Sequence, residues 1–129
     1  MITNTVCIPV HAGGTLEVGT SYIFGFRAPE AGNGGGITIT SVRFASNEAI
    51  AAASAPNLTL VSLGTNSAVN GTVATATGSV AWTAGTSFAG TLSTVFVDAE
   101  NEVAVMWAQT AENADEPVIT CAVQYVMGR

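Results

Sequence analysis

Short apolar runs, separated by glycine, asparagine and other turn residues, limit the fold of this chain more than any other feature of its sequence. Thr and Val are abundant within the runs, which is typical of β-strands. The predicted strands cover Thr5–Val10, Thr15–Arg27, Ile37–Ala45, Leu58–Leu63, Thr72–Thr77, Ser79–Thr83, Thr91–Asp98, Glu102–Gln109 and Val118–Met127. About eight or nine short strands predict an all-β fold, an antiparallel β-sandwich or jelly roll.

Two segments allow more detailed predictions. A period of two places the apolar residues of the second run on one face of its strand. These residues are Leu16, Val18, Tyr22, Phe24 and Phe26. One short helix is predicted near residues 47–54, because Asn47 suits a helix cap and Glu48 suits a first turn.

The chain has 129 residues, 48% of them hydrophobic and only 9% charged, with a net charge of −6. This length fits one domain, so we expect residues 1–129 to form a single β-sandwich. The acidic balance argues against direct nucleic-acid binding, which needs Lys and Arg to contact phosphates. We expect no membrane association, because no apolar run approaches the ~20 residues of a membrane helix and no targeting signal is visible at the N-terminus.

Cys7 and Cys121 are the two cysteines of the chain, and each lies in a strand-like apolar run. Two buried free thiols are one interpretation. A disulfide between the first and last strands is the other, and metal binding is disfavoured because no second ligand lies at the usual spacing.

Three polar stretches are candidates for a metal or phosphate site. The glycine-rich stretch Ala31–Ile37 lacks the Lys and the following helix of a phosphate loop, and we expect it to be a hairpin loop. The acidic stretches Asp98–Glu102 and Ala111–Glu116 flank one strand of about eight residues, so they are expected roughly 25 Å apart at opposite ends of it. We therefore predict no metal site and no cofactor.

No catalytic residue is predicted either. His11 is the single histidine, and a nucleophile could in principle approach it in space. The stretch Gly85–Gly90, with Ser87, only loosely matches a nucleophile elbow, since its last glycine is one position late and no helix follows. We expect the protein not to be an enzyme; a small hydrolase is kept as an alternative.

The two last strands, Val103–Gln109 and Val118–Val126, are apolar on both faces. We expect them to form a hairpin whose second apolar face packs against another copy of the chain. The candidate contacts with such a copy or with another partner are Val103, Val105, Trp107, Gln109 and Tyr125. For Trp107 three environments remain open: the core, a subunit interface, or a platform on which a sugar stacks.

Several short motifs resemble those of small jelly-roll virion proteins of tailed phages. The matching residues are Gly19-Thr20-Ser21-Tyr22-Ile23-Phe24, Gly34-Gly35-Gly36, Gly64-Thr65 and Trp107-Ala108-Gln109. The pattern covers most of the chain from Thr15. It departs in the last strand, where the family favours a Gly-Ser step and this chain has Cys121-Ala122-Val123.

This resemblance implies a virion structural protein, most simply a capsid decoration (cement) protein that is made in the host cytoplasm. Its expected location is the outer capsid surface, and its expected partners are the major capsid protein and itself, as a homotrimer. The alternative is a carbohydrate- or receptor-binding jelly-roll module of a phage tail or fibre. Trp82 and Trp107 lie inside predicted strands, which favours packing over exposed sugar binding.

Overall fold

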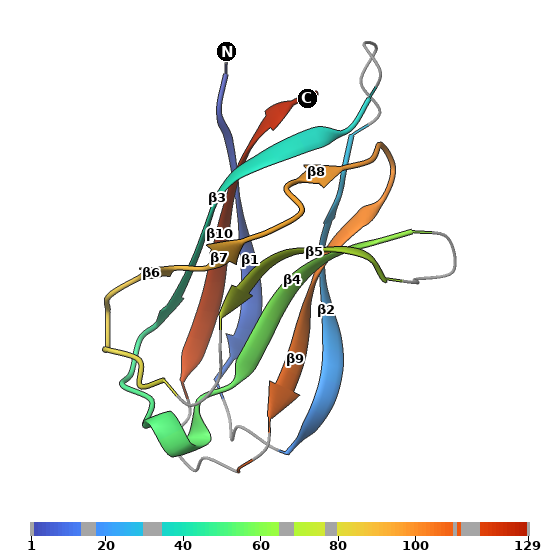
Figure 1. Ribbon diagram of the computed structural model, residues 1–129. Helices are drawn as coiled ribbons and strands as arrows, with labels where there is room; N and C mark the ends of the chain where they lie inside the picture. The colour runs from blue at the N-terminus through green and yellow to red at the C-terminus, as the bar shows by residue number, and fades with distance from the viewer. Residues whose placement is uncertain are drawn as a thin grey trace.

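The computed structural model describes residues 2–13, 18–29, 35–64, 69–76, 80–109, 111 and 117–128. Within them the chain forms two antiparallel sheets that pack face to face as a β-sandwich (Figure 1). The strands are β1 (Asn4–Ala12), β2 (Gly19–Arg27), β3 (Ile37–Ser46), β4 (Asn57–Leu63), β5 (Val69–Ala76), β6 (Phe88–Ala89), β7 (Thr91–Leu92), β8 (Phe96–Val97), β9 (Glu102–Gln109) and β10 (Val118–Met127). The prediction of an all-β sandwich is confirmed.

Consecutive strands of the chain alternate between the two sheets, except that β4 and β5 pair within one sheet. One sheet, called here the β1 sheet, has the order β1-β10-β3-β6, and β8 also pairs with β3. The other, the β2 sheet, has the order β2-β9-β4-β5-β7. Every strand pair is antiparallel, so each sheet can bury one face and leave the other to solvent.

The last two long strands do not form the predicted hairpin. β9 pairs with β2 and β4, whereas β10 pairs with β1 and β3 in the opposite sheet. Each strand is central in its own sheet, and the inward side chains of both belong to one core cluster. Because both faces of each strand are apolar, the sequence pattern could not distinguish a paired hairpin from two strands that face each other across the core.

The segment from β6 to β8 closes one side of the sandwich. Its backbone bonds alternately to the two sheets: Gly90 N–H donates to the Val42 carbonyl of β3 over 2.8 Å, and Ser93 N–H donates to the Val73 carbonyl of β5 over 2.8 Å. The chain then returns to β3, where Ile39 N–H donates to the Val95 carbonyl. The predicted single strand Thr91–Asp98 is therefore two short pieces, β7 and β8, in different sheets.

Two further predictions are corrected by the structure. In the predicted strand Ser79–Thr83, residue 79 lies outside the described residues, and Trp82 makes only an isolated bridge with Ile50. In the predicted helix the structure has a single 3-10 turn, Ala52–Ser54, without a side-chain cap. Asn47 does not cap it, because its Oδ1 instead accepts a hydrogen bond from the Val118 N–H at the start of β10.

The apolar face predicted for the second run is correct for Tyr22 and Phe24 but wrong for Phe26, and Leu16 lies outside the described residues. A register shift between Phe24 and Phe26 in the pairing of β2 with β9 marks a bulge at Gly25. Tyr22 and Phe24 lie on the outer face and are 45% and 58% exposed, whereas Phe26 turns inward and stacks on the ring of Tyr125, with 5.6 Å between centroids. A bulge reverses which face later residues occupy, and the period of two cannot foresee it.

Gly25 is required where β1 crosses over β2. A Cβ atom there would lie 2.4 Å from Ile8 Cδ1 and 3.0 Å from the Val103 carbonyl oxygen. Ile8 is almost fully buried, and the carbonyl belongs to the sheet backbone, so neither can move freely. The lack of a side chain at this position therefore permits the close approach of the two sheets.

We predict that Gly25→Ala lowers the free energy of unfolding by about 1–3 kcal/mol through overpacking. The matched control is Gly71→Ala, also within a strand, where the nearest atoms to a new Cβ lie at an ordinary 3.5 Å. That variant should change stability by less than about 1 kcal/mol. Urea denaturation measures both, and equal stability of the two variants would contradict the assigned contact.

Candidate functional site

The inward side chains of β9 lie in the core of a single chain. Val103 and Val105 have no exposed area, and Trp107 is 7% exposed. Side chains without exposed area offer no surface to a second subunit, so the structure corrects their assignment as subunit contacts. Tyr125 is half-buried, and Gln109 is 3% exposed.

Trp107 packs against His11 at one end of the core. The two rings are stacked, with 5.6 Å between centroids and 19° between planes. His11 Nδ1 lies 2.7 Å from the Pro117 carbonyl oxygen, which can only accept, so this nitrogen carries the proton. The imidazole thus links β1 to the segment before β10. Among the hydrogen bonds of the described residues, none joins His11 to a carboxylate or hydroxyl group that would make it a base.

Gln109 ties the end of β9 to two neighbouring segments. Its Nε2 donates to the Ser54 and Ala111 carbonyl oxygens, each over 2.6 Å. Its Oε1 is buried and finds no hydrogen-bond partner in the described part of the chain. The amide therefore has a structural role, since it satisfies carbonyl groups at the base of the sandwich.

The two sheets differ in the chemistry of their outer faces. The outer face of the β2 sheet is called here the outer β2 face. Its apolar residues are Tyr22, Phe24, Val61, Leu63, Val69, Ala104 and Met106, and the same face also carries Thr20, Asn57, Thr59, Thr72, Thr75 and the Arg27–Glu102 ion pair. By contrast, the outer face of the β1 sheet carries Thr5, Cys7, Pro9, Ser41, Arg43, Ala45, Thr120, Ala122 and Gln124. Small and polar groups dominate this second face, as expected for a surface in water.

The outer β2 face has a buried centre and an exposed rim. Val61, Leu63 and Ala104 form a separate apolar cluster with at most 1% exposure. Around them Tyr22 and Phe24 are exposed on one side and Val69, at 48%, on the other. Because the chain itself buries this centre, the apolar area that the face offers to a partner comes from Tyr22, Phe24 and Val69, with Met106 partly exposed. Exposed apolar side chains gathered on one face of a sheet are a candidate contact surface.

A shallow hollow lies on the same face and could receive a side chain of a partner. Its volume is about 320 Å³. It is bordered by Thr20, Ser21, Tyr22, Asn57, Thr59, Met106, Trp107 and Ala108. None of these residues carries a charge, so the hollow suits an uncharged group.

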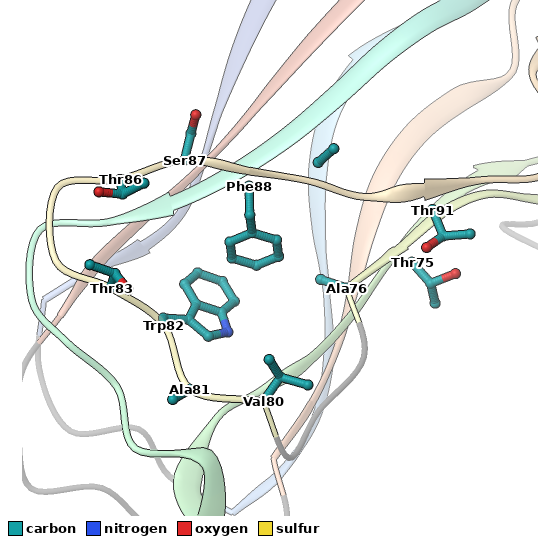
Figure 2. Close-up of a pocket in the computed structure, with 11 residues that line it drawn as sticks. Thr75, Ala76, Val80, Ala81, Trp82, Thr83, Thr86, Ser87, Phe88 and Thr91 are labelled. Carbon is teal, nitrogen blue, oxygen red and sulfur yellow. The ribbon is translucent and has the colours of Figure 1, made fainter.

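A second cavity, of about 300 Å³, lies beside Trp82 and Phe88 (Figure 2). The two rings meet edge to face with 4.7 Å between centroids. Backbone hydrogen bonds in both directions between Trp82 and Ile50 hold this segment in place. Five of the residues that line the cavity carry hydroxyl groups: Thr75, Thr83, Thr86, Ser87 and Thr91. The cavity combines an aromatic wall with neutral hydrogen-bonding groups.

The other stretches considered from the sequence form no catalytic or metal centre in the described residues. Ser87 Oγ accepts a hydrogen bond from Arg43 Nε over 2.8 Å, and its carbonyl oxygen accepts one from Nη2. No group of three or more His, Cys, Asp or Glu residues that could hold a metal ion occurs in the part that the structure describes. The segments 31–34 and 112–116 lie outside the described residues.

The two cysteines are free thiols in different environments. Cys7 faces the solvent from β1 and Cys121 faces the core from β10, so the two sulfur atoms lie on opposite faces of the β1 sheet. Of the two open interpretations, free thiols are correct, but only Cys121 is buried. Burial raises the pKa of the Cys121 thiol to about 12, and the nearby Cys7 thiol adds to this shift.

Comparisons of the chain with family models, with curated proteins and with solved structures find no match. None of the helices in the described residues is long and apolar enough to cross a membrane. The outer β2 face escaped the sequence analysis because the bulge at Gly25 conceals which side chains of β2 point outward. The one sign of this surface in the sequence was the second apolar face of Val103–Gln109.

We predict that Trp107→Ala lowers the free energy of unfolding by roughly 3–5 kcal/mol, because it removes a buried ring and leaves a cavity. Trp107→Phe should cost less, since it retains a ring against His11. Thermal and urea denaturation measure both variants. An unchanged melting temperature for Trp107→Ala would contradict its place in the core.

A second prediction concerns the thiols. In the native protein one thiol, Cys7, should react with a disulfide reagent within minutes, whereas Cys121 should react only after unfolding. Because the folded state holds Cys121 neutral, unfolding above pH 9 releases its proton, so this thiol should destabilise the protein as the pH rises from 9 towards 12. Cys121→Ala should weaken that pH dependence, and equal reactivity of both native thiols would contradict the structure.

Proposed function

We propose that this protein is a structural component of a virion, a decoration protein that binds the outer surface of a phage capsid. Its partners in this proposal are the major capsid protein and further copies of itself. The observation that carries the proposal is a difference between the two outer faces: the outer β2 face carries the exposed aromatic rings of Tyr22 and Phe24, whereas the outward residues of β1, β3 and β10 include no aromatic ring. Such a one-sided molecule suits attachment to a surface through one face.

The strand order supports the jelly-roll winding that the resemblance implies. The orders β1-β10-β3-β6 and β2-β9-β4-β5 place the first and last strands, β1 and β10, side by side in one sheet and the second and second-to-last strands, β2 and β9, side by side in the other. Two interwound Greek keys produce such an arrangement, and double-sheet jelly rolls of this kind occur in viral capsid proteins. The fold alone carries little weight, because one fold serves many functions.

The charged groups also favour a protein partner over nucleic acid. Arg27 Nε lies 3.3 Å from Glu102 Oε1, and Arg43 is bound to Ser87. Both arginines of the described residues are thus engaged within the chain and are poorly placed to bind phosphates. The net charge of −6 acts in the same direction.

A carbohydrate-binding module of a tail or fibre is the second candidate, and the cavity beside Trp82 favours it. Hydroxyl groups and aromatic rings are suitable partners for a sugar. However, Trp82 is only 4% exposed, so the face of its ring is not open for stacking. The larger apolar surface on the β2 sheet therefore makes decoration the stronger proposal.

The test is sedimentation of the purified protein with phage particles that lack it. We expect co-sedimentation that Met106→Lys weakens by about tenfold or more, equivalent to about 1.4 kcal/mol, because it places a charge in the apolar contact. The control Gln124→Lys adds the same charge to the opposite outer face and should leave binding unchanged. Failure to sediment with any particle would contradict the proposal, and competition by free glycans would favour the second candidate.

A further inference from the structure

One long edge of the sandwich carries an unpaired strand. β2 pairs with β9 on one side, and no strand of the described residues pairs with it on the other. Among the backbone hydrogen bonds of the described residues, those of Gly19–Arg27 go only to β9. Because the backbone groups of a strand alternate between its two sides, about half of the N–H and C=O groups of β2 point away from β9 without a partner.

The other sheet edges are protected against pairing. At the edge of the β1 sheet, β1 contains Pro9, which lacks a donor, and a register shift between Pro9 and His11. The remaining edge strands, β6, β7 and β8, are two residues long. Proline, bulges and short edge strands are the usual means by which proteins prevent edge-to-edge association. The edge of β2 also contains a bulge, at Gly25, but its residues include no proline, and in the described part of the chain the stretch Gly19–Phe24 before this bulge is regular.

The side chains of this edge favour contact with another apolar surface. From Gly19 to Phe26 the strand has no charged residue, and Arg27 at its end is paired with Glu102. Tyr22 and Phe24 project from the outer face beside the open edge, 45% and 58% exposed. Long, uncharged and hydrophobic edge strands are the typical sites of strand addition.

We propose that β2 pairs antiparallel with β2 of a second copy of this chain, about a two-fold axis through the middle of the strand. The two β2 sheets then join into one continuous sheet. The occupant is a second copy because the pairing is self-complementary: an antiparallel register centred on Tyr22 opposes Tyr22 to itself and Thr20 to the partner's Phe24. Such cross-strand aromatic contacts stabilise sheets.

The protected edges explain why the association stops at two copies. If β2 of one copy paired with a different edge of the next copy, the β2 edge of that next copy would stay free to bind a third copy, and a fibre would grow. Pro9 and the short strands disfavour that pairing, so β2 with β2 is the pairing that remains. The described acids do not oppose it, since Glu102 is neutralised by Arg27 and no acid lies along Gly19–Phe24.

This inference does not depend on the proposed function, and it predicts a pair where the resemblance implies a trimer. Light scattering during gel filtration at micromolar concentration should give about 26 kDa, twice the 13.0 kDa of one chain. Amide hydrogens on the free side of β2 should exchange more slowly as the protein concentration rises. A mass of 13 kDa, or a trimer near 39 kDa, would overturn the proposal.

Variants locate the contact. Phe24→Lys replaces the ring that opposes the partner's Thr20 with a charge in each copy and should reduce the mass to that of one chain; Thr20→Lys should do the same by placing a charge opposite the partner's Phe24. Val80→Lys is the matched control, because Val80 is also 58% exposed but lies away from β2, and it should leave the pair intact. Circular dichroism and melting establish that each variant is folded. A pair that survives both β2 variants, or that Val80→Lys also breaks, would refute edge pairing.

Discussion

The sandwich depends on the burial of β9 and β10 in the centres of opposite sheets. Their inward side chains belong to one core cluster, and those of Val105 and Cys121 have no exposed area. Each strand is flanked by two long partners, so its backbone is satisfied on both sides while one apolar face enters the core. Neither sheet could bury its inner face without the other. Because the chain passes from β9 in one sheet to β10 in the other, both sheets contribute to one core.

A sandwich built in this way has two outer faces, and the sequence treats them differently. On the β1 sheet, strand residues that point outward are small or polar, as Thr5 and Gln124 illustrate. On the β2 sheet, the outward Val61 and Ala104 are as well buried as core residues, and exposed aromatic rings surround them. The core does not require this second apolar cluster. Packing within the chain explains Val61 and Ala104, whereas the exposed rings of Tyr22 and Phe24 are the part of this face that a partner could cover.

Much of the fold could be predicted from the sequence, because the long strands alternate with clear turn residues. The predicted bounds Glu102–Gln109 and Val118–Met127 agree with β9 and β10. Strand pairing was not predictable from them, because a strand that is apolar on both faces fits either sheet. The bulge at Gly25 was missed for a different reason, since it depends on the close approach of Ile8, a contact distant in sequence.

The contact residues were harder to predict than the strands. The sequence pattern groups Val103, Val105 and Trp107 on one face, and that grouping is correct, but it does not state which face is inside. A tertiary contact decides this, as the stacking of Trp107 on His11 illustrates. The residues that remain available to a partner are those that point away from the core. They could be recognised only once the core was assigned.

β1 and β2 differ in how their open edges are protected. Both are nine-residue strands at sheet edges, so both expose backbone groups to association. Each contains one register shift, but β1 also contains Pro9, and its outward side chains are small or polar. β2 instead combines an unpaired edge with exposed aromatic rings, although a lysine or proline at Tyr22 or Phe24 would protect it without disturbing the core. A chain that protects one edge and leaves the other apolar has the asymmetry expected of a protein whose β2 edge is covered in its working state.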